Sequence, residues 1–244
     1  MKKSHIFTLL IFITCLPLTS WAGSFVLAQD SVAQPDSVER RTLVRFETTS
    51  GNFTIALFND TPIHRDNFIK LVSEHFYDSL LFHRTIWEFM IQTGDPTSRH
   101  AKPGEKLGEG TVGYTLPAEI HYPKYFHRRG MVAAAREGDE KNPKWESDGS
   151  QFYIVQDENG CLHLDGQYTI FGEVIEGLDV IDKIAAVETD YQSRPLRDII
   201  IESIRPVQTE PIQKDTTTVA DSVAKDSTAA SGTTVLPETR HIKE

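Results

Sequence analysis

Cysteine is scarce in this sequence, since Cys15 and Cys161 are the only two among its 244 residues. Several catalytic motifs are absent as well: the chain has no G-x-x-x-x-G-K-[ST] phosphate loop, no G-x-S-x-G nucleophile elbow and no H-E-x-x-H zinc motif. The sequence therefore gives no support to a phosphate-loop nucleotidase, a hydrolase or a zinc protease. We expect neither a bound metal nor a cofactor.

An excess of positive charge is also missing. The formal net charge is −10, the isoelectric point is near 5.4, and no basic stripe runs along the chain. A general nucleic-acid binder shows such a patch or stripe, so we expect no nucleic-acid partner. Hydrophobic residues at 39% and charged residues at 25% are typical of a soluble globular protein with polar extensions.

No apolar run is long enough for a comfortable membrane span, but a shorter one lies at the N-terminus. Two lysines precede an apolar stretch over residues 6–18, and small residues follow near Ala22. This three-part pattern predicts a secretory signal over residues 1–22, cleaved after Ala22 or alternatively after Ala28. We therefore expect an exported, periplasmic protein; a buried core helix is the other interpretation of this stretch.

Removal of the signal would leave Cys161 as the sole cysteine, which excludes an intramolecular disulfide. The fold of an exported protein without a disulfide must depend on its hydrophobic core. Cys15 has a second interpretation as a lipid-anchored residue after an imperfect lipobox, although Thr14 fits that motif poorly.

Polar segments flank one predicted domain over residues 42–207. Residues 23–41 have the composition of a linker, and residues 208–244 are rich in Thr, Ser, Ala, Asp and Lys, with no aromatic side chain. Such a tail cannot bury enough apolar surface to offset the entropy of ordering it. We predict that it is disordered and not a C-terminal helix, which its threonine clusters and Gly232 disfavour.

The domain shows mainly the pattern of short strands. "TLVRFET" and "NFTIALF" flank "TSGN" and predict a β-hairpin, and five more strand-like stretches follow: "FMIQTGD", "GMVAAAR", "SQFYIVQ", "YTIFGEV" and "DIIIESIRPV". Thr61 and Pro62 predict the N-cap and first position of a helix whose apolar residues recur from Ile63 to Phe76. A second helix fits "GLDVIDKIAAVE". Many short strands with two widely separated helices favour a closed β-barrel over alternating βαβ units.

"GEGTVG" at residues 108–113 matches the dinucleotide-binding pattern G-x-G-x-x-G. That fingerprint requires a strand before it and a helix after it, whereas Pro103 and Pro117 flank this stretch and predict a glycine-rich surface loop. His121 and His127 flank "YPKYF" in an expected loop and are only a weak candidate for a metal pair.

Three blocks of the chain carry a family resemblance. "FHRTIWEFMIQTGD" (residues 82–95), "GSQFYI" (149–154) and "LDGQYTIFGEV" (164–174) resemble, in order and spacing, the signature blocks of cyclophilin-type peptidyl-prolyl isomerases. The resemblance extends over about residues 42–207, and the sub-type looks bacterial and exported. It implies a closed eight-stranded antiparallel β-barrel capped by two α-helices, with the active site in a groove on the outer face.

The first block places Arg84 among aromatic and aliphatic residues, where a cation is costly to desolvate. Isomerisation of an X–Pro bond gives this arginine a purpose. The barrier of roughly 18–20 kcal/mol arises from C–N double-bond character, and a guanidinium can donate a hydrogen bond to the prolyl nitrogen as it pyramidalises. The resemblance assigns the catalytic role to Arg84. It assigns the orientation of Arg84 to Gln92, which we expect eight residues further along the same strand face.

The resemblance also implies a set of substrate-binding residues: Phe89, Met90, Ala135, Arg136, Gln151, Tyr153, His163, Leu164 and Tyr168. Its apolar and aromatic members would line the pocket for the proline ring, and the Tyr168 hydroxyl would reach a substrate carbonyl at the rim. His83 is expected to be a hydrogen-bonded structural histidine, because isomerisation transfers no proton. Three phenylalanines are expected in the core: Phe82, Phe152 and Phe171.

The groove departs from the common eukaryotic pattern at four positions. Tyr153 replaces a phenylalanine, so its hydroxyl must find a partner or reach water. His163 replaces the tryptophan that usually binds cyclosporin A, which predicts weak binding of that drug. Arg136 replaces an asparagine and Tyr168 replaces a histidine. The loop "REGDEKNPKWESDGS" is longer and more charged than usual, which changes one wall of the groove.

The leading interpretation is an exported isomerase of X–Pro bonds, a monomeric folding catalyst whose substrates are proline-containing polypeptides. One alternative is a module that binds proline segments without turnover, and another is a chaperone acting through its tails. The presence of both Arg84 and Gln92 favours the enzyme, since a simple binder has less need of them. The tails carry little apolar surface, which disfavours the chaperone.

Overall fold

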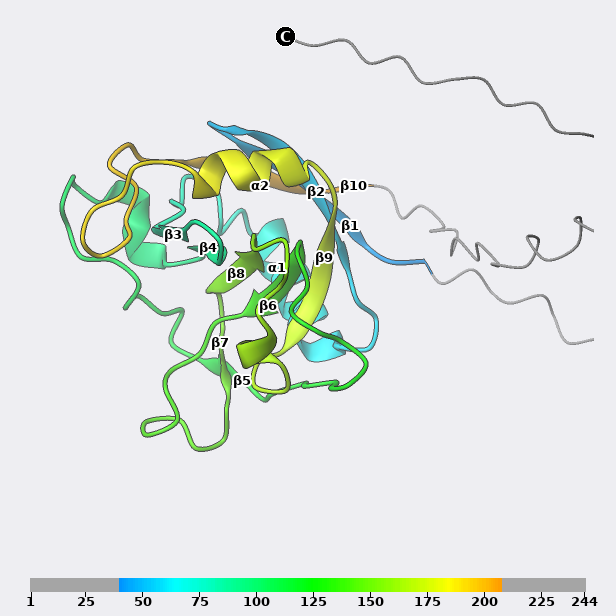
Figure 1. The fold of residues 1–244 in the computed structure, drawn as a ribbon. Helices are drawn as coiled ribbons and strands as arrows, with labels where there is room; N and C mark the ends of the chain where they lie inside the picture. The colour runs from blue at the N-terminus through cyan, green and yellow to red at the C-terminus, as the bar shows by residue number, and fades with distance from the viewer. Residues whose placement is uncertain (1–39, 208–244) are drawn as a thin grey trace, which may run out of the picture. The chain divides into compact units, whose positions relative to one another are not determined.

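Eight strands form one antiparallel sheet in the computed structural model, which describes residues 40–207. The order from one edge to the other is β10-β1-β2-β9-β6-β8-β4-β3 (Figure 1). The strands of the sheet are β1 Leu43–Thr48, β2 Gly51–Leu57, β3 Arg84–Ile86, β4 Met90–Thr93, β6 Met131–Ala134, β8 Phe152–Val155, β9 Ile170–Glu176 and β10 Ile201–Val207. A separate ribbon is formed by β5 (Thr115–Leu116) and β7 (Ser147–Asp148). The expected mainly β architecture and the "TSGN" hairpin, which joins β1 to β2, are confirmed.

Some expectations fall on parts of the chain that the structure does not describe. The signal over residues 1–22, nearly all of the linker and the tail over residues 208–244 lie outside the described range. Cys15 lies there as well, so both its interpretation and the two cleavage positions stay predictions.

The sheet curls strongly but stays open, so the expected closed barrel is wrong. Its edge strands, β10 and β3, share no ladder. The seam is bridged before either strand begins, by the isolated pair of Leu81 and Ile200 and by bonds such as Phe82 N–H to the Ile199 carbonyl at 3.0 Å. Bonds from the Ser79 N–H to the Ile201 carbonyl at 2.7 Å and from the Ile201 N–H to the Leu80 carbonyl at 2.8 Å extend this bridge, but among the described strands β3 forms a ladder with β4 alone. The result is a half-barrel.

The first and last strands of the sheet lie side by side. β1 pairs with β10 from Leu43, opposite Val207, to Thr48, opposite Ile201, with one irregularity. β10 is an edge strand, and Pro206 within it removes one donor from the ladder. Proline and charge on an edge oppose pairing with other chains, and Arg205 supplies the charge.

Alternation along the strands divides the buried apolar side chains into two clusters. On β8, Phe152 and Ile154 join the main core, whereas Tyr153 and Val155 join a second cluster on the other face of the sheet. The main core contains the three phenylalanines expected there: Phe82, Phe152 and Phe171. The second cluster lies where the resemblance places the groove.

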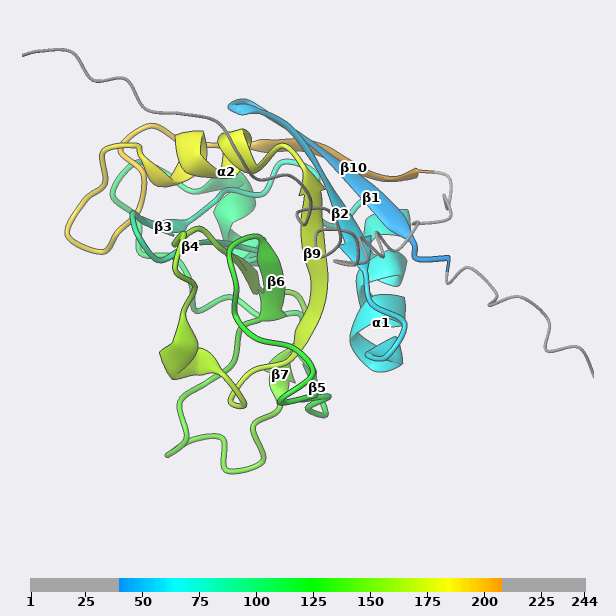
Figure 2. The same ribbon diagram turned by 45° about the vertical axis from the view of Figure 1, so that its right-hand side comes forward.

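Two α-helices accompany the sheet, as predicted. α2 (Leu178–Ala185) lies along the top of Figures 1 and 2, beside β2, β3 and β4, and α1 (Pro62–Ser73) lies lower and contacts β10. Two short 3-10 helices, η1 (Pro96–His100) and η2 (Leu162–Leu164), complete the elements. Ile63, expected on the apolar face of α1, is exposed instead. No helix within residues 40–207 is long and apolar enough to cross a bilayer.

The N-terminus of α1 receives its cap from a distant loop. Thr61 stands at the N-cap, as predicted, but its hydroxyl makes no cap bond and is buried without a partner among the described residues. The carboxylate of Glu119 instead accepts the backbone N–H groups of Ile63 at 3.1 Å and His64 at 3.0 Å. A carboxylate at this position satisfies orphan donors and complements the helix dipole.

Candidate active site

Four neighbouring strands place Arg84, Gln92, Tyr153 and Ala133 in one row across the sheet. The register pairs Arg84 with Gln92, Gln92 with Tyr153, and Tyr153 with Ala133. Residues directly opposite one another in antiparallel strands point to the same face. The row therefore brings both predicted catalytic residues onto the face that carries the second apolar cluster.

Gln92 lies on β4, beside Arg84 on β3, and not further along the same strand as expected. The chain reverses between them in a turn over residues 87–89, where Glu88 has φ of 55°. The predicted contact exists all the same, because Arg84 Nη1 donates a hydrogen bond to Gln92 Oε1 at 3.3 Å. It is a cross-strand contact.

The guanidinium of Arg84 is half-buried against apolar groups. Its central carbon lies 5.9 Å from the centroid of the Phe89 ring, and Nη1 lies 3.8 Å from the Met90 sulfur. Burial lowers the pKa of Arg84 below its ordinary value, but a guanidinium stays protonated at neutral pH. Among the ion pairs of residues 40–207, none involves Arg84, so its charge is not neutralised by a neighbouring carboxylate.

A relay of side-chain amides fixes Gln92. Gln92 Nε2 donates to Gln151 Oε1 at 3.1 Å, and Gln151 Nε2 donates to the carbonyl groups of Gly108 and Gly110 at 3.1 and 2.8 Å. The "GEGTVG" loop is therefore a surface loop, as predicted, with a positioning role that its sequence did not indicate. Because every amide in the relay has a defined polarity, the Gln92 carbonyl oxygen faces Arg84.

The second apolar cluster lies next to the guanidinium. Met90, Ala133 and Tyr153 are buried in it, and three of the expected pocket residues pack against it from outside: Phe89, Leu164 and Tyr168. His163 is exposed and its ring lies 5.6 Å from the Phe89 ring. The structure thus brings these predicted residues together around Met90, and their role in holding a proline ring stays a prediction.

The Tyr153 hydroxyl finds the partner that the sequence required. Tyr153 Oη lies 3.0 Å from Nε2 of His127, a fully buried residue whose Nδ1 lies 2.9 Å from Asp165 Oδ1. His127 is therefore engaged by these two residues, and His121 is not its partner. Neither His127 nor Asp165 was predicted as a site residue, because a separation of 26 residues between Tyr153 and His127 carries no sequence signal.

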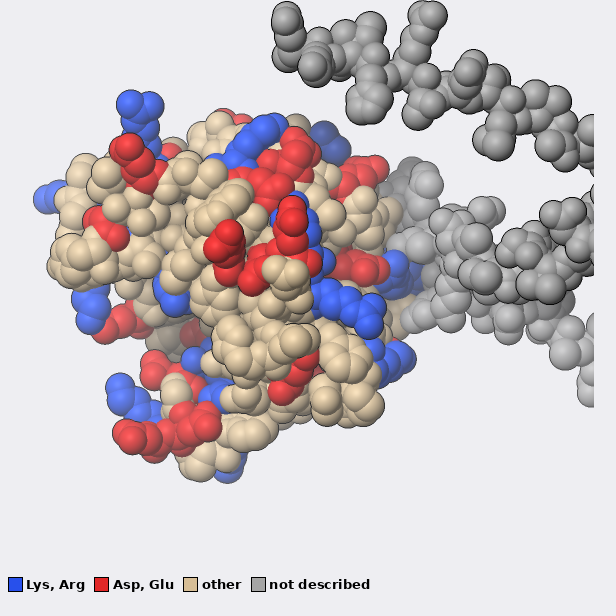
Figure 3. Space-filling view, in the orientation of Figure 1, with Lys and Arg blue, Asp and Glu red and all other residues tan. Residues whose placement is uncertain are grey.

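A hollow of about 240 Å³ adjoins the amide relay. The predicted residues Gln92, Ala135, Arg136 and Gln151 line it together with charged residues of the following loop. Both backbone polar groups of Ala135 already have partners, since its N–H donates to the Gln151 carbonyl at 2.9 Å and its carbonyl accepts from Asp148 N–H at 2.8 Å. The loop over residues 137–146, at the lower left of Figure 1, displays charges of both signs (Figure 3).

Arg136 is held by aromatic rings at the end of this hollow. Its guanidinium lies 4.6 Å from the Tyr168 ring centroid and 5.3 Å from the Trp145 ring centroid. It also donates to the Gln167 carbonyl at 3.0 Å and to the Asp139 carboxylate at 2.6 Å. Arg136 therefore clamps the long loop against Tyr168 and shapes the groove wall. The contribution of Trp145 was not predicted.

One buried cluster has the order of a hydrolytic triad. Ser147 Oγ lies 2.9 Å from His64 Nε2, and His64 Nδ1 lies 2.7 Å from Glu119 Oε2. Ser147 and His64 are each 2% exposed, so no substrate can reach the hydroxyl, and burial lowers the pKa of His64. The cluster instead joins β7 and the loop of Glu119 to α1, and the absence of a hydrolase motif from the sequence agrees with this reading.

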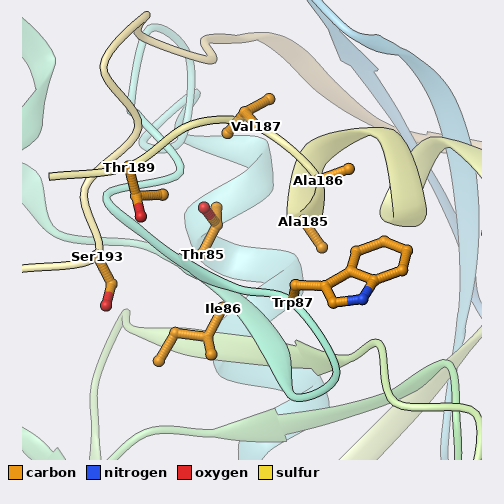
Figure 4. A pocket seen from close by; sticks show the side chains of 8 residues that line it. All are labelled: Thr85, Ile86, Trp87, Ala185, Ala186, Val187, Thr189 and Ser193. Carbon is orange, nitrogen blue, oxygen red and sulfur yellow. The ribbon is translucent and has the colours of Figure 1, made fainter.

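A further hollow, of about 440 Å³, lies beside the C-terminal end of α2. It is lined by Thr85, Ile86, Trp87, Ala185, Ala186, Val187, Thr189 and Ser193 (Figure 4). None of the predicted site residues lines it. The predicted site residues lie instead around Arg84 and Gln92 and along the hollow beside the amide relay.

A guanidinium without a carboxylate partner among the described residues lies beside a cluster of apolar side chains, and such a group can donate hydrogen bonds to a peptide backbone. Comparison with known proteins specifies the class. The family model described as "Cyclophilin type peptidyl-prolyl cis-trans isomerase/CLD" matches residues 43–206. This chain belongs to that family.

Individual relatives agree with the family match. Peptidyl-prolyl cis-trans isomerase-like 1 of Neurospora crassa is 36% identical over 173 residues, which cover 70% of this chain and 98% of that protein. Peptidyl-prolyl cis-trans isomerase-like 2 of Rhizopus delemar is also 36% identical, over 69% of this chain but only 29% of that longer protein.

Solved structures agree as well. A crystal structure of a cyclophilin type peptidyl-prolyl cis-trans isomerase of Cryptosporidium parvum superposes with a TM-score of 0.60 at 31% identity, over 70% of this chain and 99% of that one. A second structure of the same protein, determined in the presence of the dipeptide Ala-Pro, gives a TM-score of 0.57 over 68% of this chain and 99% of that one.

Proposed function

We propose that this protein is an exported peptidyl-prolyl isomerase that accelerates rotation about X–Pro bonds in other exported polypeptides. The observation that carries the proposal is the Arg84 guanidinium, which is half-buried beside Phe89 and Met90 and oriented by Gln92. Desolvating a cation is costly, so a protein that places one beside an apolar pocket without a carboxylate partner requires its donors for a ligand.

The reaction needs little from the protein besides a positioned donor. In planar X–Pro the nitrogen lone pair is delocalised into the carbonyl, and at the twisted transition state it is localised on nitrogen. Arg84 donates a hydrogen bond to this nitrogen, an interaction that is stronger in the transition state than in either planar ground state. In a partly dehydrated groove such a donor has a much larger effect than in water.

The surrounding residues supply binding and alignment. The pocket of Met90, Tyr153 and Leu164 holds the proline ring, while Phe89 flanks the guanidinium. The amide relay from Gln151 to Gln92 keeps the arginine fork from turning away between substrates. The Ala-Pro dipeptide used with the Cryptosporidium protein supports proline-containing polypeptides as the substrate class.

The place of action is proposed from the sequence. Two lysines, an apolar stretch and Ala22 form the pattern of a secretory signal, which supports an exported, periplasmic enzyme of bacterial sub-type acting as a monomer. Lipid anchoring through Cys15 is the alternative attachment. The rival function is a module that binds proline segments without turnover, and the aligned Arg84–Gln92 pair favours the enzyme over it.

Exchange spectroscopy on a short peptide with an Ala–Pro bond tests the proposal. The wild-type protein should accelerate cis–trans exchange, and Arg84→Ala should lower kcat/KM by about 10²–10³ while the protein stays folded, as expected for loss of one preorganised donor. Arg84→Lys is the matched control, because it keeps the charge but lacks the planar fork, and we expect it to recover only part of the rate. A folded Arg84→Ala variant with near-wild-type exchange would exclude this role.

A further inference from the structure

Three hydrogen-bonded polar side chains, two buried and one partly buried, lie beside the predicted proline-binding residues. Asp165 Oδ1 lies 2.9 Å from His127 Nδ1, and His127 Nε2 lies 3.0 Å from Tyr153 Oη. His127 has no exposed surface and Tyr153 is 6% exposed. Buried polar groups are costly to leave unpaired, so these hydrogen bonds constrain each of the three side chains strongly.

The hydrogen bonds that link these three side chains all run in one direction, from Tyr153 through His127 to Asp165. The Asp165 carboxylate can only accept, and it also accepts the backbone N–H of His127 at 2.7 Å. The proton of neutral His127 is therefore on Nδ1, which leaves Nε2 as an acceptor for the Tyr153 hydroxyl. Burial lowers the pKa of His127 in spite of the nearby carboxylate, which favours this neutral form. Tyr153 donates, His127 relays, and Asp165 accepts.

These hydrogen bonds connect two walls of the proposed pocket that come from different elements of the fold. Tyr153 belongs to β8, whereas Asp165 directly follows η2 and lies in the segment of residues 161–168 that carries His163, Leu164 and Tyr168. The carbonyl of His127 also accepts the N–H of Cys161 at 2.8 Å. The His127 ring stacks on the Tyr153 ring at 6.0 Å and meets the Tyr168 ring edge-on at 6.2 Å.

We propose that His127 and Asp165 are positioning residues that fix the Tyr153 ring and the segment of residues 161–168 as opposed walls of the proline pocket. They hold the pocket in its binding shape before substrate arrives, so the protein does not have to order it on binding. This inference rests on the proposed isomerase function. It goes beyond it by assigning a role to two residues that do not touch the substrate.

The proposal predicts a kinetic signature different from that of Arg84. Pocket walls contact the proline ring similarly in the cis, trans and twisted states, so loosening them weakens all three by similar amounts. Such uniform binding appears in KM and leaves kcat nearly unchanged, whereas loss of Arg84 lowers kcat. A role confined to folding stability would change neither constant in the molecules that remain folded.

Two substitutions of His127 separate its two hydrogen bonds. In His127→Asn the amide N–H can replace Nδ1–H and keep the bond to Asp165, but the Tyr153 hydroxyl loses its acceptor. In His127→Gln the amide oxygen can reach the Nε2 position and accept from Tyr153, but Asp165 loses its side-chain donor. Tyr153→Phe removes one hydroxyl only and is the least disruptive change.

The measurements are kcat and KM for the Ala–Pro peptide, its Kd by NMR titration, and thermal melts of each variant. Tyr153→Phe and His127→Asn should raise KM and Kd about threefold to tenfold, the effect of one net hydrogen bond, with kcat within about twofold of wild type. The KM and Kd of the double variant Tyr153→Phe/His127→Asn should be no higher than those of Tyr153→Phe, because both changes remove the same hydrogen bond. The KM and Kd of His127→Gln should lie between those of these variants and those of the wild-type protein.

Each outcome decides the question. Unchanged KM and Kd in folded Tyr153→Phe, a fall in kcat in place of a rise in KM, or additive effects in the double variant would overturn the proposal. If the His127 variants do not fold, Tyr153→Phe alone decides it. If the wild-type protein binds the peptide without accelerating exchange, the isomerase proposal fails, and the Kd values still test the positioning role. If the wild-type protein does not bind the peptide, both proposals fail.

Discussion

Acid should destabilise this protein well above the pH at which its carboxylates titrate, and His83 should account for a large share of the loss. His83 precedes Arg84, is 4% exposed, and neither of its ring nitrogens has a hydrogen-bond partner among the described residues. The expectation of a hydrogen-bonded structural histidine is therefore wrong here. Burial lowers the pKa of His83 from 6.5 to about 4, with Arg84 and Arg194 acting in the same direction and Asp95 against it.

The sign and size of the effect follow from linkage. Above pH 6.5 the ring is neutral in both the folded and the unfolded state, and it contributes no pH dependence. As the pH falls below 6.5, the unfolded chain takes up a proton that the folded protein excludes, so the free energy of unfolding decreases. Each pH unit costs about 1.4 kcal/mol, which gives a loss of about 2 kcal/mol near pH 5 and about 3 kcal/mol below pH 4. The total free energy of unfolding of a typical domain is only about 5–15 kcal/mol.

Urea unfolding at about pH 7.5, 6 and 5 measures this loss. Between about pH 7.5 and 5, the free energy of unfolding of His83→Leu should fall by about 2 kcal/mol less than that of wild type. The substitution removes the group that titrates in the unfolded state, and it removes no hydrogen bond. Replacement of His100, which is exposed, by Gln is the control and should follow wild type. His64 and His127, whose pKa values burial also lowers, will add to the wild-type loss but cancel in the comparison. A stability difference between wild type and His83→Leu that is independent of pH would refute the reasoning.

Two further predictions concern the drug and the ends of the chain. Cyclosporin A should inhibit weakly, because His163 lacks both the broad apolar face and the indole N–H of tryptophan; His163→Trp should tighten binding in a titration, and nanomolar binding by the natural protein would contradict this. Compared with the mature form that lacks the signal, a protein trimmed to residues 42–207 should keep full activity on the peptide and lose less than about 0.5 kcal/mol of stability, because residues 23–41 and 208–244 offer little apolar surface to bury. A thermal melt that falls by several degrees on trimming would show that one of those segments stabilises the domain.

The sequence was informative where contacts are local or where a block of residues repeats a family pattern. The hairpin and both helices could be predicted because periodicity and turn residues determine them, and the core positions of Phe82, Phe152 and Phe171 because these residues lie within the family blocks. The row of Arg84, Gln92 and Tyr153 could be predicted only in part, because a turn at Glu88 converts an apparent single strand into two.

The remaining errors share one physical cause, which is contact between distant segments. The carboxylate that caps α1 comes from Glu119, and the acceptor for the Tyr153 hydroxyl comes from His127. The seam is held by a few bonds between residues 79–82 and residues 199–201, which end before β3 begins. Residue type indicated that Tyr153 needed a partner, but spacing along one chain could not indicate which residue supplies it.

The pairing of β1 with β10 has a consequence for how such a domain can be used. Leu43 and Val207 face each other, so the points where the chain enters and leaves the domain are separated by one cross-strand spacing, about 5 Å. A domain whose ends are adjacent can be spliced into a surface loop of another protein, or appended to either end of one, with little strain on its host. The same unit can then make up 98% of one relative and 29% of another. A circular permutant that joins residues 207 and 43 by a short glycine linker and opens the chain in the loop over residues 137–146 should fold, as a thermal melt would show.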